Sequence, residues 1–173
     1  PGVPINPYGQ TKLVGEWMVK NAANWGLKGV NLRYFNVAGS ESKQLADTAE
    51  LNLIPIAIAQ LKRGEQPIVF GTDYPTPDGS CIRDYIHVED LAKAHLMAVD
   101  YLTTPNQKYA TFNVGTGQGA SVLQVLEELK IASGIKFEEL LADRRPGDPP
   151  RLVANTHRIE KVFGFKASFG LKE

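Results

Sequence analysis

The sequence comprises 173 residues, of which 43% are apolar and 22% are charged, a composition typical of a soluble globular protein and not of a disordered one. Nineteen basic residues balance nineteen acidic ones, so the charge gives no reason to expect nucleic acid or a membrane surface as a partner. No apolar run approaches the roughly 20 residues that a membrane-spanning helix requires. The single cysteine, Cys81, excludes an internal disulfide and favours a cytoplasmic location.

A first helix is predicted to run from Pro7 to about residue 25. Proline suits the first turn of a helix, Asn6 can cap its free N–H groups, and Gly26 is a good C-terminal stop. Alternating β-formers, turn residues and helical spacing continue along the chain. They predict strands at 29–39, 67–71, 81–88, 109–117 and 136–142, helices at 51–64, 88–102, 122–133 and 155–165, a surface loop at 39–50 and a turn at 72–80.

This alternation of strands and helices places the chain in the α/β class. The strand, glycine-rich turn and helix with which nucleotide-binding α/β enzymes open are missing. The nearest glycine cluster, GTGQG at 115–119, lacks the required spacing and is predicted to be an ordinary strand-to-helix turn. None of the three histidines has metal-ligand spacing with another histidine or an acid, so no metal site is expected. His87 is interpreted as a structural residue and Cys81 as a passive thiol.

Tyr8 and Lys12 lie four residues apart on the first predicted helix. Residues at this spacing share one face, with Cβ atoms about 5–6 Å apart. A lysine ammonium that close to a phenol favours the phenolate, which can act as a base. The alternative is an ordinary amphipathic helix that carries one tyrosine and one lysine.

Five motifs together resemble one family. They are NPYGQTK at 6–12, LRYFNVAG at 32–39, VFGTDYPTPDGSCIRDYIHVEDLA at 69–92, FNVGTG at 112–117 and RRPGDPPRLVAN at 144–155. In this order they resemble the extended short-chain dehydrogenase/reductases, and within them the UDP-glucose 4-epimerases. The long block at 69–92 is the most specific of the five, because a generic α/β protein has no need of it.

The resemblance begins at the helix that carries Tyr8, so the chain is expected to be the C-terminal half of such an enzyme. Residues 1–38 would be a remnant of the NAD-binding Rossmann domain, namely its last helix and strand. Residues 39–173 would form a small mixed α/β region that binds the UDP-sugar. With the rest of the cofactor domain absent, the chain alone is expected to be inactive and to bind little or no NAD. The resemblance also implies a homodimer for the complete enzyme, with the Tyr8 helix in the contact.

For catalysis, the resemblance implies that Tyr8 is the general base at the 4-hydroxyl of the sugar. Lys12 would activate Tyr8 and hold the ribose next to the nicotinamide, and Tyr34 and Phe35 would lie close to the same part of NAD. The cofactor takes hydride from C4 and returns it to the other face of a 4-keto intermediate, which interconverts UDP-glucose and UDP-galactose. A serine or threonine that precedes the tyrosine in the family has no counterpart in this chain.

For the substrate, the resemblance implies a set of residues spread over the rest of the chain. Arginine suits a diphosphate because its planar fork donates two parallel hydrogen bonds. The implied residues are Arg83, Arg145, Asn36, Asn52 and Leu53 at the diphosphate, Asp148 at the ribose, and Ile68 and Phe70 at the uracil. The alternatives are a surface salt bridge between Arg83 and Asp84, and core packing for Phe70.

The position of Leu152 in this family governs the size of the sugar pocket. Tyrosine there restricts the substrate to plain hexoses, whereas leucine is expected to leave room for UDP-N-acetylhexosamines. The alternative is that Leu152 opens a short apolar run and packs inward. Two further functions stay open for the whole chain: a UDP-sugar-binding module without chemistry, and another nucleotide-sugar enzyme of this scaffold, such as a dehydratase, a decarboxylase or a 4-reductase.

Overall fold

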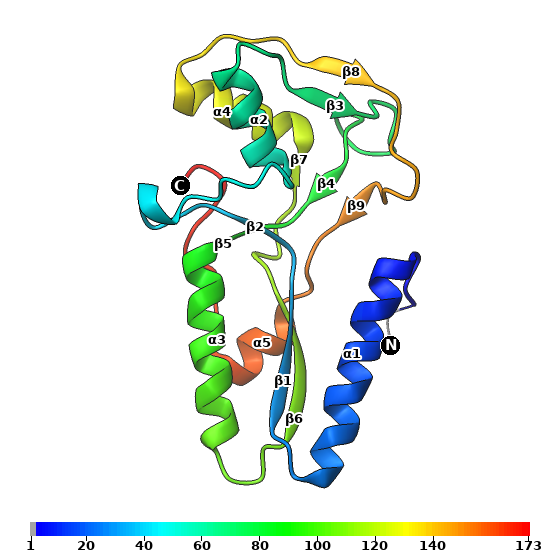
Figure 1. Cartoon of the computed structure of the whole chain (residues 1–173), viewed down its shortest axis with the longest axis vertical. Helices are drawn as coiled ribbons and strands as arrows, with labels where there is room; N and C mark the ends of the chain where they lie inside the picture. The colour runs from blue at the N-terminus through cyan, green and yellow to red at the C-terminus, as the bar shows by residue number, and fades with distance from the viewer. Residues whose placement is uncertain (1–2) are drawn as a thin grey trace.

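The computed structural model describes residues 3–173, so the first two residues of the predicted segment 1–38 lie outside it. The molecule is elongated (Figure 1). One end holds a parallel strand pair flanked by helices, and the other holds short strands and two helices. The elements of the first end are α1 (Pro7–Ala22), η1 (Ala23–Trp25), β1 (Gly29–Tyr34), α3 (Val88–Thr103), β6 (Tyr109–Val114) and α5 (His157–Phe163).

The remaining elements build the other end and the junction between the two ends. They are β2 (Asn36–Ala38), η2 (Lys43–Leu45), α2 (Leu53–Lys62), β3 (Ile68–Phe70), β4 (Ile82–Arg83), β5 (Tyr85–His87), β7 (Ala120–Ser121), α4 (Val122–Ser133), β8 (Leu140–Ala142) and β9 (Arg151–Leu152). Every predicted helix and strand is present, and the α/β class is confirmed. The strand predicted at 136–142 is shorter, and β7 and β9 were not predicted; both have only two residues, too few for a periodic signal.

The main core lies around β6, which alternates half-buried and fully buried residues along its length. β1 pairs with it in parallel, from Gly29 opposite Tyr109 to Tyr34 opposite Val114. Phe112 is almost fully buried and packs with residues of β5, α3 and α5. α3 and α5 therefore cover one side of this strand pair, and α1 lies along its other side (Figure 1). Trp17 of α1 remains 55% exposed.

Two of the predicted strands are divided, and both divisions change the pairing partner. The first runs through β1 and β2, and after Phe35 it leaves β6 and pairs with β5. The second runs through β4 and β5; before Asp84 it pairs with β7 and β9, and after Asp84 with β2. The two switch points meet, because the N–H of Asn36 donates to the carbonyl of Asp84 at 3.0 Å. This junction connects the two ends of the molecule.

A second, smaller core holds the other end together. Ala57 of α2, Val69 of β3 and Leu126 of α4 are buried against one another. β3 pairs in parallel with β8 at the far edge of the molecule. A capping box fixes the start of α4: Ser121 accepts from the N–H of Gln124 at 3.1 Å, and the Gln124 side chain accepts from the N–H of Ser121 at 2.9 Å. Ser121 is therefore the N-cap of α4.

Candidate functional site: a cavity at the junction of the two ends

A cavity of about 330 Å³ lies beside the junction, between α2, β3, the strands that leave the junction and the segment before β9. Its wall contains eight of the residues that the family resemblance associates with a UDP-sugar. They are Asn36, Asn52, Leu53, Ile68, Phe70, Arg83, Arg145 and Asp148. Residues far apart in the sequence thus surround one volume. Parallel α/β proteins bind ligands at such points, where the strand order switches.

Asn52 and Leu53 lie at the cavity because α2 begins there. Asn52 precedes the helix and its side chain makes no capping hydrogen bond. The first N–H groups of a helix have no partner within the helix, and together with the helix dipole they favour a negatively charged group. The first turn of α2 therefore adds backbone donors to the wall formed by Asn52, without any charged side chain.

Arg83 is held in place by three contacts. Its Nη1 donates to the carbonyls of Ile82 at 2.8 Å and Pro149 at 2.9 Å, and its Nη2 lies 3.4 Å from Oδ1 of Asp148. The alternative of a salt bridge with Asp84 is wrong, because the Asp84 carboxylate is fully buried and serves other donors. It accepts from the N–H groups of Thr116, Gly117 and Ala154.

Arg145 and Asp148 are the two ends of one tight turn. The N–H of Asp148 donates to the carbonyl of Arg145 at 3.3 Å, Pro146 follows Arg145, and Gly147 has φ of 81°. Proline at the second position and a positive φ at the third are the marks of a type II turn. The turn brings both side chains to the cavity. The guanidinium of Arg145 lies over the ring of Phe70, with Cζ 3.8 Å from the ring centroid.

Tyr85 and Cys81 also line the cavity, and sequence reasoning gave neither of them a place in the site. Burial raises the pKa of Tyr85 to about 12, although the nearby Arg83 lowers it and Cys81 raises it. Its phenol therefore stays protonated at neutral pH and can donate a hydrogen bond. Both residues lie within the segment CIRDY at 81–85, which also contains Arg83. This shared segment is the only feature of the sequence that indicates that they line the site.

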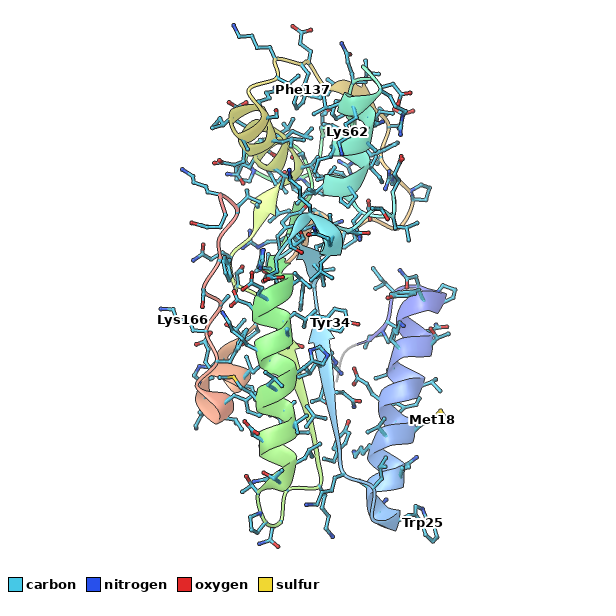
Figure 2. All side chains as sticks on the ribbon, turned by 60° about the vertical axis from the view of Figure 1, so that its left-hand side comes forward. Met18, Trp25, Tyr34, Lys62, Phe137 and Lys166 are labelled. Atoms are coloured by element: carbon cyan, nitrogen blue, oxygen red, sulfur yellow. The ribbon has the colours of Figure 1, made fainter. Side chains whose placement is uncertain are left out.

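The residues predicted for catalysis and cofactor binding do not line this cavity. Lys12 Nζ lies 5.2 Å from the centroid of the Tyr8 ring, so the predicted pair does share one face of α1. The Tyr8 side chain is 71% exposed. Tyr34 is also exposed and stands at the end of β1 (Figure 2), and Phe35 is half-buried at the strand division. Leu152 lies outside the cavity wall as well, on β9.

Residues 3–173 contain no group of three His, Cys, Asp or Glu side chains placed to hold a metal ion. Over the same residues, no helix has the length and apolarity needed to cross a membrane.

Residues 1–115 match the model of the NAD dependent epimerase/dehydratase family. The chain belongs to this family. It is 48% identical over 170 residues to the UDP-glucose 4-epimerase of Azospirillum brasilense, a match that covers 95% of this chain and 49% of that protein. The chain therefore spans about half the length of the curated relatives it matches.

Solved structures of epimerases have the same fold. The UDP-glucose 4-epimerase from Brucella ovis, solved in complex with NAD, superposes with a TM-score of 0.90 at 40% identity, over 98% of this chain and 54% of that one. The UDP-Glc/GlcNAc 4-epimerase from Campylobacter jejuni superposes with a TM-score of 0.76 at 42% identity, over 99% and 54%. This member of the epimerase/dehydratase family is thus related to UDP-sugar 4-epimerases over nearly its whole length.

Proposed function

We propose that this chain supplies the substrate-binding half of a UDP-glucose 4-epimerase, which interconverts UDP-glucose and UDP-galactose through a 4-keto intermediate. The observation that carries the proposal is the cavity. Every residue that the family resemblance assigns to the UDP-sugar, except Leu152, lies in its wall. Residues from motifs spread over the chain thus surround one volume, as a site for a single ligand requires.

The wall matches the chemistry of a nucleoside diphosphate. Arg83 and Arg145 supply positive charge and N–H donors for the two phosphates, and the first turn of α2 supplies backbone donors. Ile68 and Phe70 supply an apolar edge for the base. Asp148 is proposed to accept from the ribose hydroxyls, while its contact with Arg83 fixes the direction of that guanidinium.

Catalysis is proposed to rest on Tyr8 and Lys12. Lys12 lies on the same face of α1 as Tyr8, and the exposed Tyr8 side chain, as its phenolate, is proposed to accept the proton of the 4-hydroxyl of a sugar. The ammonium of Lys12 suits a cofactor ribose as a hydrogen-bond donor, and Tyr34 and Phe35 offer aromatic surface at the end of β1. NAD, when bound, supplies the oxidation and reduction at C4.

The boundary between the cofactor-binding and substrate-binding parts of the chain is proposed to lie after residue 38. Residues 1–38 would belong to the cofactor domain and residues 39–173 to the substrate region. This is a functional division and not a gap in packing, because β1 pairs with β6 and β2 pairs with β5 across it. NAD binding and turnover are proposed for the complete protein, with little of either on residues 1–173 alone.

The complete protein is proposed to be a homodimer that uses α1, whose Trp17 and Met18 are exposed.

Calorimetric titration of residues 1–173 with UDP, and with ADP as the matched control, tests the proposal. UDP should bind at least about tenfold more tightly than ADP, because the wall of the cavity includes a base subsite as well as phosphate ligands. Equal affinity for the two nucleotides would contradict a UDP-sugar site. If UDP binds but a complete form of the protein does not convert UDP-galactose, the binding module without chemistry becomes the better description.

A further inference from the structure

The two arginines of the cavity differ in how they are held. Arg83 is half-buried, contacts an acid and donates to two backbone carbonyls. Arg145 is exposed, and among residues 3–173 its guanidinium forms no ion pair and no hydrogen bond. The Arg145 guanidinium lies over a face of the Phe70 ring, with Cζ 3.8 Å from the ring centroid.

Only the side chain of Arg145 has to move for this contact to open. Its backbone is fixed by the type II turn that ends at Asp148. The preceding residue, Arg144, is anchored elsewhere, with Nε 2.6 Å from Oδ1 of Asp73 and its guanidinium over the ring of Tyr74. A long, flexible side chain on a rigid backbone can therefore leave Phe70 without disturbing the rest of the wall.

We propose that Arg145 couples recognition of the base to recognition of the diphosphate. This inference rests on the proposed function, in which Phe70 borders the base. The guanidinium covers the face of the Phe70 ring, so a base can use that face only after Arg145 has moved. A diphosphate draws Arg145 away, because charge-assisted hydrogen bonds to phosphate are stronger than a cation–π contact at an exposed site.

The consequence is selectivity against ligands that lack phosphates. A nucleoside or a free base must displace Arg145 and offers no anion in return. A nucleoside diphosphate replaces the lost contact with a stronger one and uncovers the aromatic ring at the same time. Arg145 thus acts in two opposite directions: it strengthens the binding of UDP and weakens the binding of uridine.

The two directions can be measured with Arg145→Ala. UDP affinity, followed by calorimetry, should fall about tenfold to a hundredfold, as expected for the loss of a charge-assisted contact. Uridine affinity, followed by NMR titration, should rise about two- to fivefold, as expected for release of an exposed cation–π contact. Arg144→Ala is the matched control, because that neighbouring arginine is held by Asp73 and Tyr74; it should change neither affinity.

Phe70→Leu separates this mechanism from a general loosening of the site. In the Phe70→Leu background, the removal of Arg145 should no longer improve uridine binding, because there is no aromatic face to uncover. An unchanged or weaker uridine affinity in Arg145→Ala would overturn the inference and leave the UDP site intact. If UDP does not bind the parent at all, the proposed function fails, and the inference fails with it.

Discussion

Arg83 and Asp148 meet in the wall of the cavity, with Nη2 of the arginine 3.4 Å from Oδ1 of the aspartate. Arg83 comes from β4, and Asp148 closes the turn that precedes β9. The same arginine donates to the carbonyl of Pro149. One side chain therefore joins the central strand of the β7–β4–β9 sheet to the segment that carries two of the proposed substrate ligands. Its remaining N–H groups stay available for phosphate.

Arg83→Ala should weaken UDP binding by about tenfold to a hundredfold, since it removes a charged donor fork worth roughly 1.5–3 kcal/mol. Stability should change less, because the contact with Asp148 is partly exposed and such pairs contribute little. Arg83→Lys keeps the charge without the planar fork and should recover only part of the affinity. Calorimetry with UDP and thermal unfolding of each variant measure the two effects. UDP affinity equal to that of the parent would remove Arg83 from the site.

Asp84 is expected to matter for stability and not for binding. Its buried carboxylate accepts from the N–H groups of Thr116 at 2.9 Å, Gly117 at 3.0 Å and Ala154 at 3.1 Å. Asp84→Ala leaves these donors without their acceptor, which should lower the free energy of unfolding by about 3–5 kcal/mol. Urea unfolding measures this value. Asp73→Ala is the control: that carboxylate is exposed, and its loss should lower stability by less than about 1 kcal/mol.

Local signals in the sequence predicted the helices well. Asn6 does cap α1, with its Oδ1 accepting from the N–H of Gly9 at 2.8 Å. Gly26 does end the helical segment, at a φ of 97° that other residues rarely adopt. Ser121 caps α4 through a complete capping box. These features depend on residues a few positions apart, which is the range over which a sequence pattern carries information.

Contacts between residues that are far apart in the sequence could not be predicted from local patterns. Nothing in the sequence around Asp84 distinguishes a carboxylate that pairs with Arg83 from one that binds the loop at 115–117. The outcome depends on where β4 and β5 change partners. The loop can also approach the Asp84 carboxylate only because residue 115 is a glycine. A side chain at Gly115 would place its Cβ 2.6 Å from Oδ2 of Asp84. The family resemblance gathered the cavity residues in advance, whereas periodicity alone gave no indication that Tyr85 would be among them.

Asp90 should make stability depend on pH. Burial raises the pKa of its carboxyl, but hydrogen bonds from the N–H groups of Phe169 and Ser168 and from Lys93 lower it by more, so the net pKa lies below the ordinary value. A depressed folded-state pKa adds stability that is present above the unfolded pKa, about 3.9, and is lost as the pH falls through the folded pKa.

Asp90→Asn should therefore unfold more easily than the parent at pH 7, and the difference in the free energy of unfolding should shrink below about pH 4. Urea unfolding from pH 7 to pH 3 measures both values. A difference that stayed constant over this range would show that the ionised carboxylate is not the stabilising group.

Tyr8→Phe tests the proposed base in a complete, active form of the protein. Turnover of UDP-galactose should fall by about a hundredfold to ten-thousandfold, the usual contribution of a positioned base, with KM nearly unchanged. The fold should be unaffected, because the Tyr8 side chain is 71% exposed. Lys12→Met should also slow turnover, whereas Lys20→Met, at an exposed position further along α1, should not. A loss of less than about tenfold in Tyr8→Phe would refute the assignment.

Leu152 is the proposed determinant of which sugars fit. It stands directly opposite Arg83 in the parallel pairing of β4 and β9. Residues that face each other on adjacent strands project to the same side of the sheet, so the Leu152 side chain lies on the side of Arg83, next to the cavity and outside its wall. A position beside the phosphate subsite suits a group that contacts the sugar beyond the second phosphate.

Leu152→Tyr should narrow the range of substrates in a complete form of the protein. Leu152 is 48% exposed, so the larger ring can be accommodated without disturbing a core. The kcat/KM for UDP-N-acetylgalactosamine should fall at least about tenfold relative to that for UDP-galactose, because the phenol ring occupies the space that an N-acetyl group needs. Leu141→Tyr, the same change at an exposed leucine on β8 away from the cavity, should leave the ratio unchanged. If Leu152→Tyr also leaves the ratio unchanged, Leu152 packs beside the site without selecting its sugar.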